Sequence, residues 1–269
     1  MRSLRKYIAV LKISTQNMLQ YRGNIVLNWL LSTMTLVAPF AFWKTVYADR
    51  EMLAGYELSD TITYVMLTTL LGKLLICDGI HNTISQDIRE GKLSQFLWRP
   101  INYKAYIFFD TIGKKLMDFV VMCLLFSILL IPMSALGFFK TALSTGTAFA
   151  FLFSAFLGII LSFFLYFIMG LVAFWMTECS ALYITLGTLF YFLAGGMFPL
   201  DMFRELKVIS EILPFQYQLY LPVKIYLGKL SMAMVFRGIG IQMIWCLALW
   251  GISVIVWESG KKRYSSVGN

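Results

Sequence analysis

Charged residues are scarce in this sequence. They make up 14% of the 269 residues, against about 25% in an average soluble domain, while hydrophobic residues reach 59%. A soluble chain of this length could bury a full core without charge-free runs of about 18 residues. The composition therefore indicates an integral membrane protein.

Residues that build metal centres and disulfides are also few. The cysteines Cys77, Cys123, Cys179 and Cys246 lie far apart and form no CxxC pair, so neither a zinc site nor a disulfide framework is predicted. The single histidine, His81, has no second ligand beside it and is interpreted as a polar residue at a membrane boundary. The sequence has no Ser-His-Asp set and no H-E-x-x-H motif.

Nucleotide-binding signatures are missing as well. None of the Gly-Lys pairs, such as Gly91-Lys92, Gly113-Lys114 and Gly228-Lys229, has the preceding glycine and the following hydroxyl of a G-x-x-x-x-G-K-[ST] phosphate loop. The net charge of +9 fits the cytoplasmic excess of Lys and Arg in membrane proteins, because no basic run is interleaved with aromatics outside the apolar segments. We therefore expect a non-catalytic chain without a metal, a cofactor or a nucleic-acid partner of its own.

What the chain does have is long apolar runs. Six of them are long enough to cross a hydrocarbon core, which takes about 20 helical residues. The first is too long for a signal peptide and is expected to be retained. The predicted fold is all-α and polytopic, a single domain over residues 1–269, with spans at Ile25–Trp43, Ile62–Ile80, Leu116–Phe139, Thr147–Met176, Ala181–Phe198 and Ile239–Trp257.

The basic residues predict the orientation of these spans. Lys and Arg concentrate at the N-terminus, in the loop between spans two and three, and in the tail at Lys261–Arg263. The loop between spans one and two is mainly acidic. Both termini are therefore expected in the cytoplasm.

Residues 4–20 are predicted to form an amphipathic helix outside the spans. Its apolar residues fall on one arc at 100° per residue, opposite its cations. The stretch is too polar to span a bilayer and suits the headgroup plane. Two compatible interpretations stay open: an elbow lying on the membrane, or a helix packed on a partner.

The cytoplasmic segment over residues 84–100 is predicted to be a pair of short helices. Gly91 permits a sharp turn between them, and Pro100 ends the second. An apolar face on such helices is typical of a surface that binds a partner. The residues expected at this surface are Asp87, Ile88, Arg89, Gly91, Leu93, Phe96, Leu97, Arg99 and Pro100.

Residues 199–229 are expected outside as short broken helices that cap the bundle. Glycine and proline interrupt this region, and its apolar residues recur at helical spacing. Broken backbone at membrane depth is tolerated only where protein or a water-filled cavity surrounds it. The residues that mark the cap are Gly195, Gly196, Pro199, Pro214 and Phe215.

Charged residues inside spans are costly and therefore informative. Lys73 and Asp78 lie in the second span, and Asp118 on the next helix is a candidate partner for Lys73. Asp110, Lys114 and Asp118 follow at i, i+4 and i+8, so they can form a ladder on one helix face. Two interpretations remain for Lys73: structural pairing, or a place on a transport path.

Small residues recur along the fourth span at every fourth position. This spacing allows close helix contact, either within one chain or at a dimer seam. The residues are Ser154, Gly158, Ser162, Tyr166 and Gly170.

Together with the predicted elbow helix and cap, two stretches of sequence make the chain resemble the type-2 ATP-binding-cassette exporter permeases. Within that family it is similar to a bacterial subfamily of about 260–270 residues. One of the two stretches is Asp87–Leu93 with Leu97–Pro100. The other is Gly195–Leu200 with Leu213–Phe215, Pro222 and Leu227-Gly228.

The resemblance implies a permease subunit without catalysis in the bacterial inner membrane. A separate ATPase, in two copies, would hold ATP and Mg²⁺, and a second permease chain, identical or a paralogue, would complete the path. The 84–100 helix pair would dock into the ATPase, with Ile88, Phe96 and Leu97 filling its cleft and Arg89 and Arg99 orienting the helices.

Three other functions are alternatives to this one. An autonomous secondary transporter would need intramembrane carboxylates or repeats with broken helices, and only Asp78 and Asp118 are candidates. A membrane enzyme would need clustered His, Asp or Glu at an interface, which is missing. A scaffold without transport would lack a neighbouring gene for an ATPase.

Overall fold

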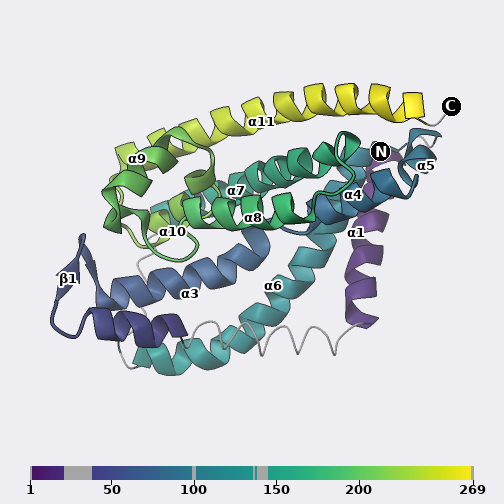
Figure 1. Ribbon diagram of the computed structural model, residues 1–269. Helices are drawn as coiled ribbons and strands as arrows, with labels where there is room; N and C mark the ends of the chain where they lie inside the picture. Colours follow the sequence, from purple (N-terminus) through teal and green to yellow (C-terminus); the bar gives the residue numbers. More distant parts are fainter. Residues whose placement is uncertain (1, 21–37, 99–100, 136, 138–144, 268–269) are drawn as a thin grey trace.

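The computed structural model describes residues 2–20, 38–98, 101–135, 137 and 145–267 (Figure 1). The described part is almost entirely helical. Its elements are α1 (Arg2–Gln20), a helical stretch at residues 38–46, β1 (Met52–Leu53), β2 (Tyr56–Glu57), α3 (Leu58–Leu75), α4 (Ile80–Arg89), α5 (Leu93–Trp98), α6 (Tyr103–Ala135), α7 (Thr145–Leu171), η1 (Val172–Phe174), α8 (Ser180–Leu193), η2 (Leu200–Met202), α9 (Arg204–Ile212), η3 (Phe215–Tyr217), α10 (Tyr220–Tyr226) and α11 (Met232–Val267). The strands form one antiparallel hairpin that pairs Met52 with Glu57.

Three stretches of the described chain are long and apolar enough to cross a membrane. They are Leu58–Arg89, Gly146–Phe174 and Met232–Tyr264. The first and third contain the predicted second and sixth spans, and the middle one covers the predicted fourth span except for its last two residues. The first predicted span falls mostly on residues 21–37, outside the described residues. The third begins within α6, but its end also lies outside them.

Two predicted spans differ from the helices that form. The second was expected to run to Ile80, but α3 ends at Leu75 and α4 begins only at Ile80, after Gly79 with a φ of +85°. The fifth was expected to reach Phe198, but α8 stops at Leu193. Its 14 residues rise about 21 Å, less than a hydrocarbon core of about 30 Å. Gly195, with a φ of +74°, turns the chain there.

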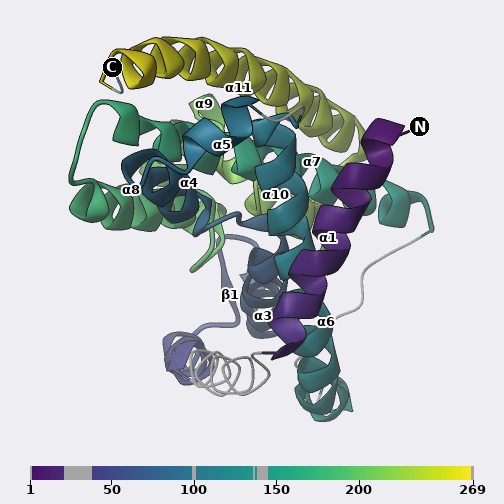
Figure 2. The ribbon, with the colours of Figure 1, turned by 90° about the vertical axis from the view of Figure 1, so that its right-hand side faces the viewer.

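The molecule has two distinct ends (Figure 1). The N-terminus, the C-terminus, α4 and α5 gather at one end, and the β hairpin, α9 and α10 lie at the other. The helices α3, α7, α8 and α11 run between the ends, whereas α1 lies across this direction and packs on α6 (Figure 2). A single bundle thus carries one polar structure at each end.

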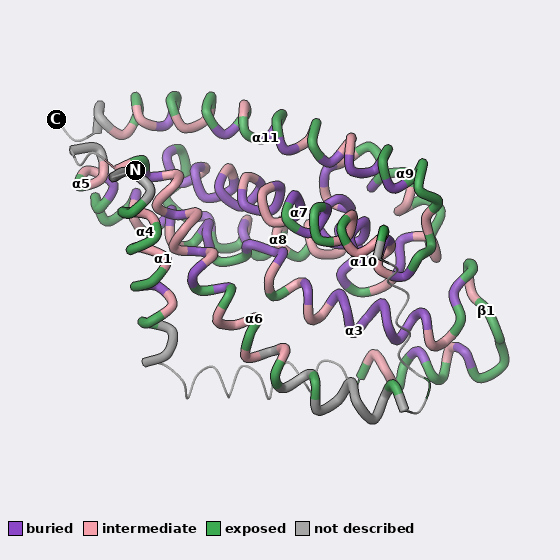
Figure 3. Tube along the Cα trace, turned by 180° about the vertical axis from the view of Figure 1, so that it is seen from behind, coloured by how far each residue is buried: buried purple, intermediate pink, exposed green. Residues whose placement is uncertain are grey.

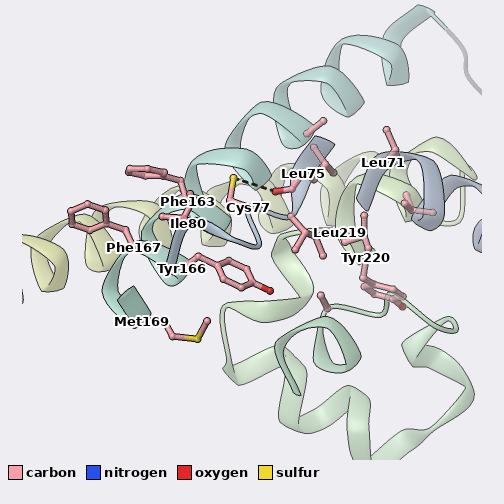
Figure 4. Packing of buried hydrophobic residues seen from close by; sticks show 14 of the residues in the cluster. Leu71, Leu75, Cys77, Ile80, Phe163, Tyr166, Phe167, Met169, Leu219 and Tyr220 are labelled. Atoms are coloured by element: carbon pink, nitrogen blue, oxygen red, sulfur yellow. Dashed lines mark hydrogen bonds between the residues drawn. The ribbon is translucent and has the colours of Figure 1, made fainter. Parts of the chain in front are cut away.

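The core lies where α7 meets α3, α4 and α10 (Figure 4). Tyr64, Leu75, Phe167 and Leu219 are fully buried there. By contrast, α11 buries only 22% of its most apolar window, against 61% for α7 (Figure 3). The outer face of α11 therefore has no cover within the described chain.

The small residues of α7 face the chain's own core. Ser154 donates a hydrogen bond to Gln242 of α11, and Ser162 accepts one from the backbone N–H of Cys77. A Cβ at Gly158 would lie 2.6 Å from the carbonyl oxygen of Gln218. The small residues of α7 therefore pack within the chain, which is the first of the two predicted interpretations.

Candidate functional site

The first candidate site is the α4–α5 pair, and the predicted turn at Gly91 is present. Gly91 has a φ of +74°, which favours glycine, and separates Arg89 from Leu93. The two helices stand at the end that carries both termini (Figure 1). The sequence pattern thus located both helices and the residue that joins them.

The apolar face of this pair points inward, contrary to the expectation. Ile84 and Leu93 are fully buried and Ile88 is 7% exposed, all within the chain's own core. Phe96 is half-buried and packs on Tyr106, with ring centroids 4.8 Å apart. Ile88 and Leu93 therefore hold α4 and α5 to the bundle rather than offering a free apolar surface.

Close packing against α7 seats α4. A Cβ added at Gly170 would lie 2.9 Å from Ile84 Cβ and 3.0 Å from the Cα of His81. A side chain at position 170 would thus collide with the backbone of α4. Gly170 is the residue that lets α4 approach this closely.

Polar contacts fix α4 and α5 from three directions. Asp87 accepts a hydrogen bond from the hydroxyl of Tyr103 on α6 at 2.8 Å. Arg89 donates to the carbonyl of Thr177, before α8, at 3.1 Å. Ser94 and the hydroxyl of Tyr264, near the end of α11, are 2.9 Å apart. A displacement of the pair must therefore move α6, α8 and α11 as well.

The outward face of the pair is polar. Glu90 and Lys92 form an exposed ion pair at 2.5 Å, and the side-chain amide of Gln86 donates to Glu90 at 2.6 Å. Gln95 is exposed on α5. The side chains of Leu97, Arg99 and Pro100 lie outside the described residues. Gln86, Glu90, Lys92 and Gln95 thus face solvent, although the apolar pattern did not single them out. Arg89, which was expected at this surface, is exposed as well.

The intramembrane charges pair differently from the expectation. Asp78 forms an ion pair with Lys115 at 3.1 Å, and Lys115 also donates to the carbonyl of Lys73. Among the described residues this pair takes the place of the expected Lys73–Asp118 contact. Lys73 itself is exposed and Asp118 is half-buried. The Asp110–Lys114 rung of the predicted ladder forms at 2.7 Å.

The second candidate site is the cap at the opposite end. Gly195 and Gly196 end α8 there, and the hydroxyls of Tyr64 and Tyr191 donate to their respective carbonyls. Pro199 and Pro214 precede the short helices η2 and η3. Phe215 stacks on Phe190 of α8, with centroids 4.6 Å apart. All five predicted cap residues thus lie in one structure.

Asp201 organises this cap and was not predicted. One carboxylate oxygen lies 2.9 Å from Lys207, and the other accepts hydrogen bonds from Lys224 at 2.6 Å and from Tyr56 at 2.8 Å. Burial alone would raise the pKa of Asp201, but the hydrogen bonds from Lys224, Tyr220 and Lys207 outweigh it and hold the pKa well below its usual range. Asp201 is therefore a fixed anion.

A second ion pair ties the β hairpin region to the cap. Lys229 lies 2.6 Å from Asp60, whose side chain is 7% exposed, and also donates to the carbonyl of Gly55. In the sequence, Asp60 is only one of several acidic residues between the first two predicted spans. Its partner Lys229 lies 169 residues away along the chain, so no local pattern could have revealed the pair.

The residues of the two sites do not include a cluster of potential metal ligands, of three or more His, Cys, Asp or Glu residues, in the part of the chain that the structure describes. His81 is buried between Tyr166 and Tyr183. Both sites are instead rigid polar structures at the two ends of a membrane bundle.

Comparison with known proteins decides the family. Residues 33–268 match the family described as ABC-2 family transporter protein. The chain belongs to this family. No curated protein sequence matches it. This ABC-2 chain is accordingly a transmembrane permease component of an ABC transporter, and components of this kind are generally non-catalytic.

Proposed function

We propose that this ABC-2 permease is the membrane subunit of an ATP-driven exporter, moved by a separate ATPase through α4 and α5. The observation that carries the proposal is the way in which this helix pair is held to the rest of the chain. The pair is fixed by Asp87 and Ser94 to α6 and α11 and by Arg89 to the segment before α8, and its outer face is exposed. A helix pair that is firmly held on one side and exposes a polar face on the other is suited to transmit force from a docked protein.

The proposed membrane arrangement has six spans, with both termini and α4–α5 in the cytoplasm. The gathering of the two termini and this helix pair at one end supports it (Figure 1). The N-terminal cations and the Lys261–Arg263 tail supply the positive charge expected on that side. The cap around Asp201 would then face outward.

In this arrangement α1 is the elbow at the cytoplasmic surface of the inner membrane. It lies across the direction of the long helices (Figure 2). Tyr7 stacks on Phe109 of α6 at 5.4 Å, and a Cβ at Gly113 would lie 2.7 Å from the carbonyl of Leu11. Ile8 and Ile13 stay exposed and would face lipid. Helix α1 would thus be an elbow on the membrane that is also packed on another helix, α6 of the same chain.

The contact surface for the ATPase is the polar outer face rather than the apolar residues expected first. Gln86, Glu90, Lys92 and Gln95 are proposed to touch the ATPase. Arg89, by contrast, is committed to Thr177. Ile88 and Phe96 would transmit the motion into the bundle, because they join the helix pair to its core.

The active transporter would contain two ATPase subunits, which hold ATP and Mg²⁺, and a second permease chain, identical or a paralogue. The outer face of α11 is available for that second chain or for lipid, because only 22% of its apolar window is buried. The permease would act as one domain over residues 1–269.

Co-purification with the ATPase subunit tests the proposal. Lys92→Glu reverses the charge on the outer face, while the exposed Glu90–Lys92 pair adds little to stability. The variant should lose most of the bound ATPase and keep normal membrane insertion. The matched control is Arg204→Glu on α9, the same charge change at the opposite end. A second test protein combines Lys92→Glu with Gln95→Glu. If it and the single Lys92→Glu variant both recover as much ATPase as Arg204→Glu, this contact surface is refuted.

A further inference from the structure

A cavity of about 300 Å³ lies beside the Asp201 cluster, and the transport proposal does not use it. Residues of α9, η3, α10 and the first turns of α11 line it, and these elements meet at the cap end of the molecule (Figure 1). Its lining is divided by chemistry into a cationic part and an apolar part.

The cationic part comprises Lys207, Lys224 and Arg237. Lys207 and Lys224 share the single carboxylate of Asp201, one on each oxygen. Glu211 is the one acidic residue in the lining. Three cations thus face two carboxylates, which leaves one positive charge for a ligand to neutralise.

Arg237 is the cation with the greatest freedom to bind a ligand. It is exposed, and no carboxylate among the described residues lies within ion-pair distance of it. Its guanidinium offers a planar fork of donors, which matches the oxygens of a phosphate group. Gln216, also in the lining, adds a side-chain amide.

The apolar part of the lining comprises Leu221, Leu230, Met234 and Ile241. It opens at the molecular surface, because Met234 is 59% exposed. A soluble anion would leave this apolar part unfilled, and a neutral lipid would leave the cation unpaired. A ligand that satisfies both parts carries an anionic head and an apolar tail.

We propose that this cavity binds an anionic phospholipid, with the phosphate at Arg237 and an acyl chain along Met234 and Ile241. The head group would lie at the level of the cap and the chain would follow α11 toward the bilayer. The binding depends only on the cavity and not on coupling to an ATPase. The two proposals can therefore fail independently.

Native mass spectrometry of the purified full chain in a non-ionic detergent tests this site. Three ligands are compared. Phosphatidylglycerol carries an anionic head and apolar tails, diacylglycerol carries the tails alone, and glycerol 3-phosphate carries the head alone. Wild-type protein should retain phosphatidylglycerol well above the other two. Equal retention of diacylglycerol, or equal affinity for glycerol 3-phosphate, would overturn the proposal of an anionic amphiphile.

Substitutions assign the binding to this cavity. Arg237→Gln should raise the Kd for phosphatidylglycerol about tenfold, the loss expected for one charge-assisted contact. Arg237→Lys keeps the charge and should bind within a few fold of wild type. Arg204→Gln removes an exposed arginine of α9 that does not line the cavity, and should change nothing. An Arg237→Gln variant that binds as tightly as Arg204→Gln would refute the site.

Discussion

The contact between α4 and α7 gives a prediction whose size can be worked from the structure. The perturbation is Gly170→Ala. The new methyl group would lie 2.9 Å from Ile84 Cβ and 3.0 Å from His81 Cα, about 0.5–1 Å inside ordinary carbon contact. Because one of these atoms belongs to the backbone of α4, the helix itself must shift.

Overpacking of this kind costs about 1–3 kcal/mol, and the higher helix propensity of alanine returns at most about 1 kcal/mol. We expect a net loss of about 1–2 kcal/mol in the free energy of unfolding. The matched control is Gly187→Ala in α8, where a Cβ meets no atom within 4 Å. That variant should be neutral or more stable by about 1 kcal/mol, so the two should differ by about 2 kcal/mol.

Thermal unfolding in detergent measures this difference. A thiol-reactive fluorophore reports it when both variants also carry Cys123→Ser, because the remaining Cys77, Cys179 and Cys246 are buried and react on unfolding. Gly170→Ala should have a Tm below that of Gly187→Ala by about 4–8 °C, from the usual 2–4 °C per kcal/mol. It should also weaken stimulation of the ATPase, because α4 carries the contact surface. Equal Tm values for the two variants would show that α4 is not seated on α7 as described.

Three further predictions concern other parts of the molecule. Asp201→Asn leaves Lys224 without its charge partner at a site that is only 12–13% exposed, so it should cost about 3 kcal/mol, measured by the same thermal assay. Because the pKa of Asp201 is lowered, wild-type protein should keep this stability above about pH 4 and lose it as the pH falls further. The Asp201→Asn variant should lack this part of the acid dependence. Identical profiles of stability against pH for the two proteins would contradict the role of Asp201. Gly113→Val should detach α1 from α6 and expose α1 to limited proteolysis, since even a Cβ there lies 2.7 Å from the Leu11 carbonyl; an unchanged cleavage pattern would disprove that packing. Cysteines introduced at Ser265 and Glu205, with Cys123→Ser to remove background, should be labelled by a membrane-impermeant maleimide from opposite faces; labelling from one face would rule out the proposed topology.

Much of the architecture could be predicted from the sequence. Apolar length located three of the six predicted spans, the second, fourth and sixth, because a hydrocarbon core sets the number of residues that a helix needs. Gly91 and the Gly195-Gly196 pair marked real turns, since both Gly91 and Gly195 adopt a positive φ that other residues rarely tolerate. These features depend on local chemistry, which a sequence displays directly.

What could not be predicted depends on which elements meet. Periodicity showed that Ile88 and Leu93 lie on apolar faces, but not that the chain's own α6 and α7 would cover them. The pairing of Asp78 with Lys115 depends on how α6 packs against the turn between α3 and α4, a feature absent from any single helix. The same holds for Asp201, whose partners come from separate elements before and after it.

The account's central claim is that a separate ATPase docks on the outer face of α4 and α5. Site-specific photo-crosslinking tests it most directly. A photoreactive amino acid would replace Gln95, which is exposed on α5, and in a second protein it would replace Arg204, which is exposed on α9 at the opposite end. The account predicts a crosslinked species containing the ATPase subunit from position 95 and none from position 204. No adduct from position 95, while the ATPase still co-purifies with the chain, would contradict the claim.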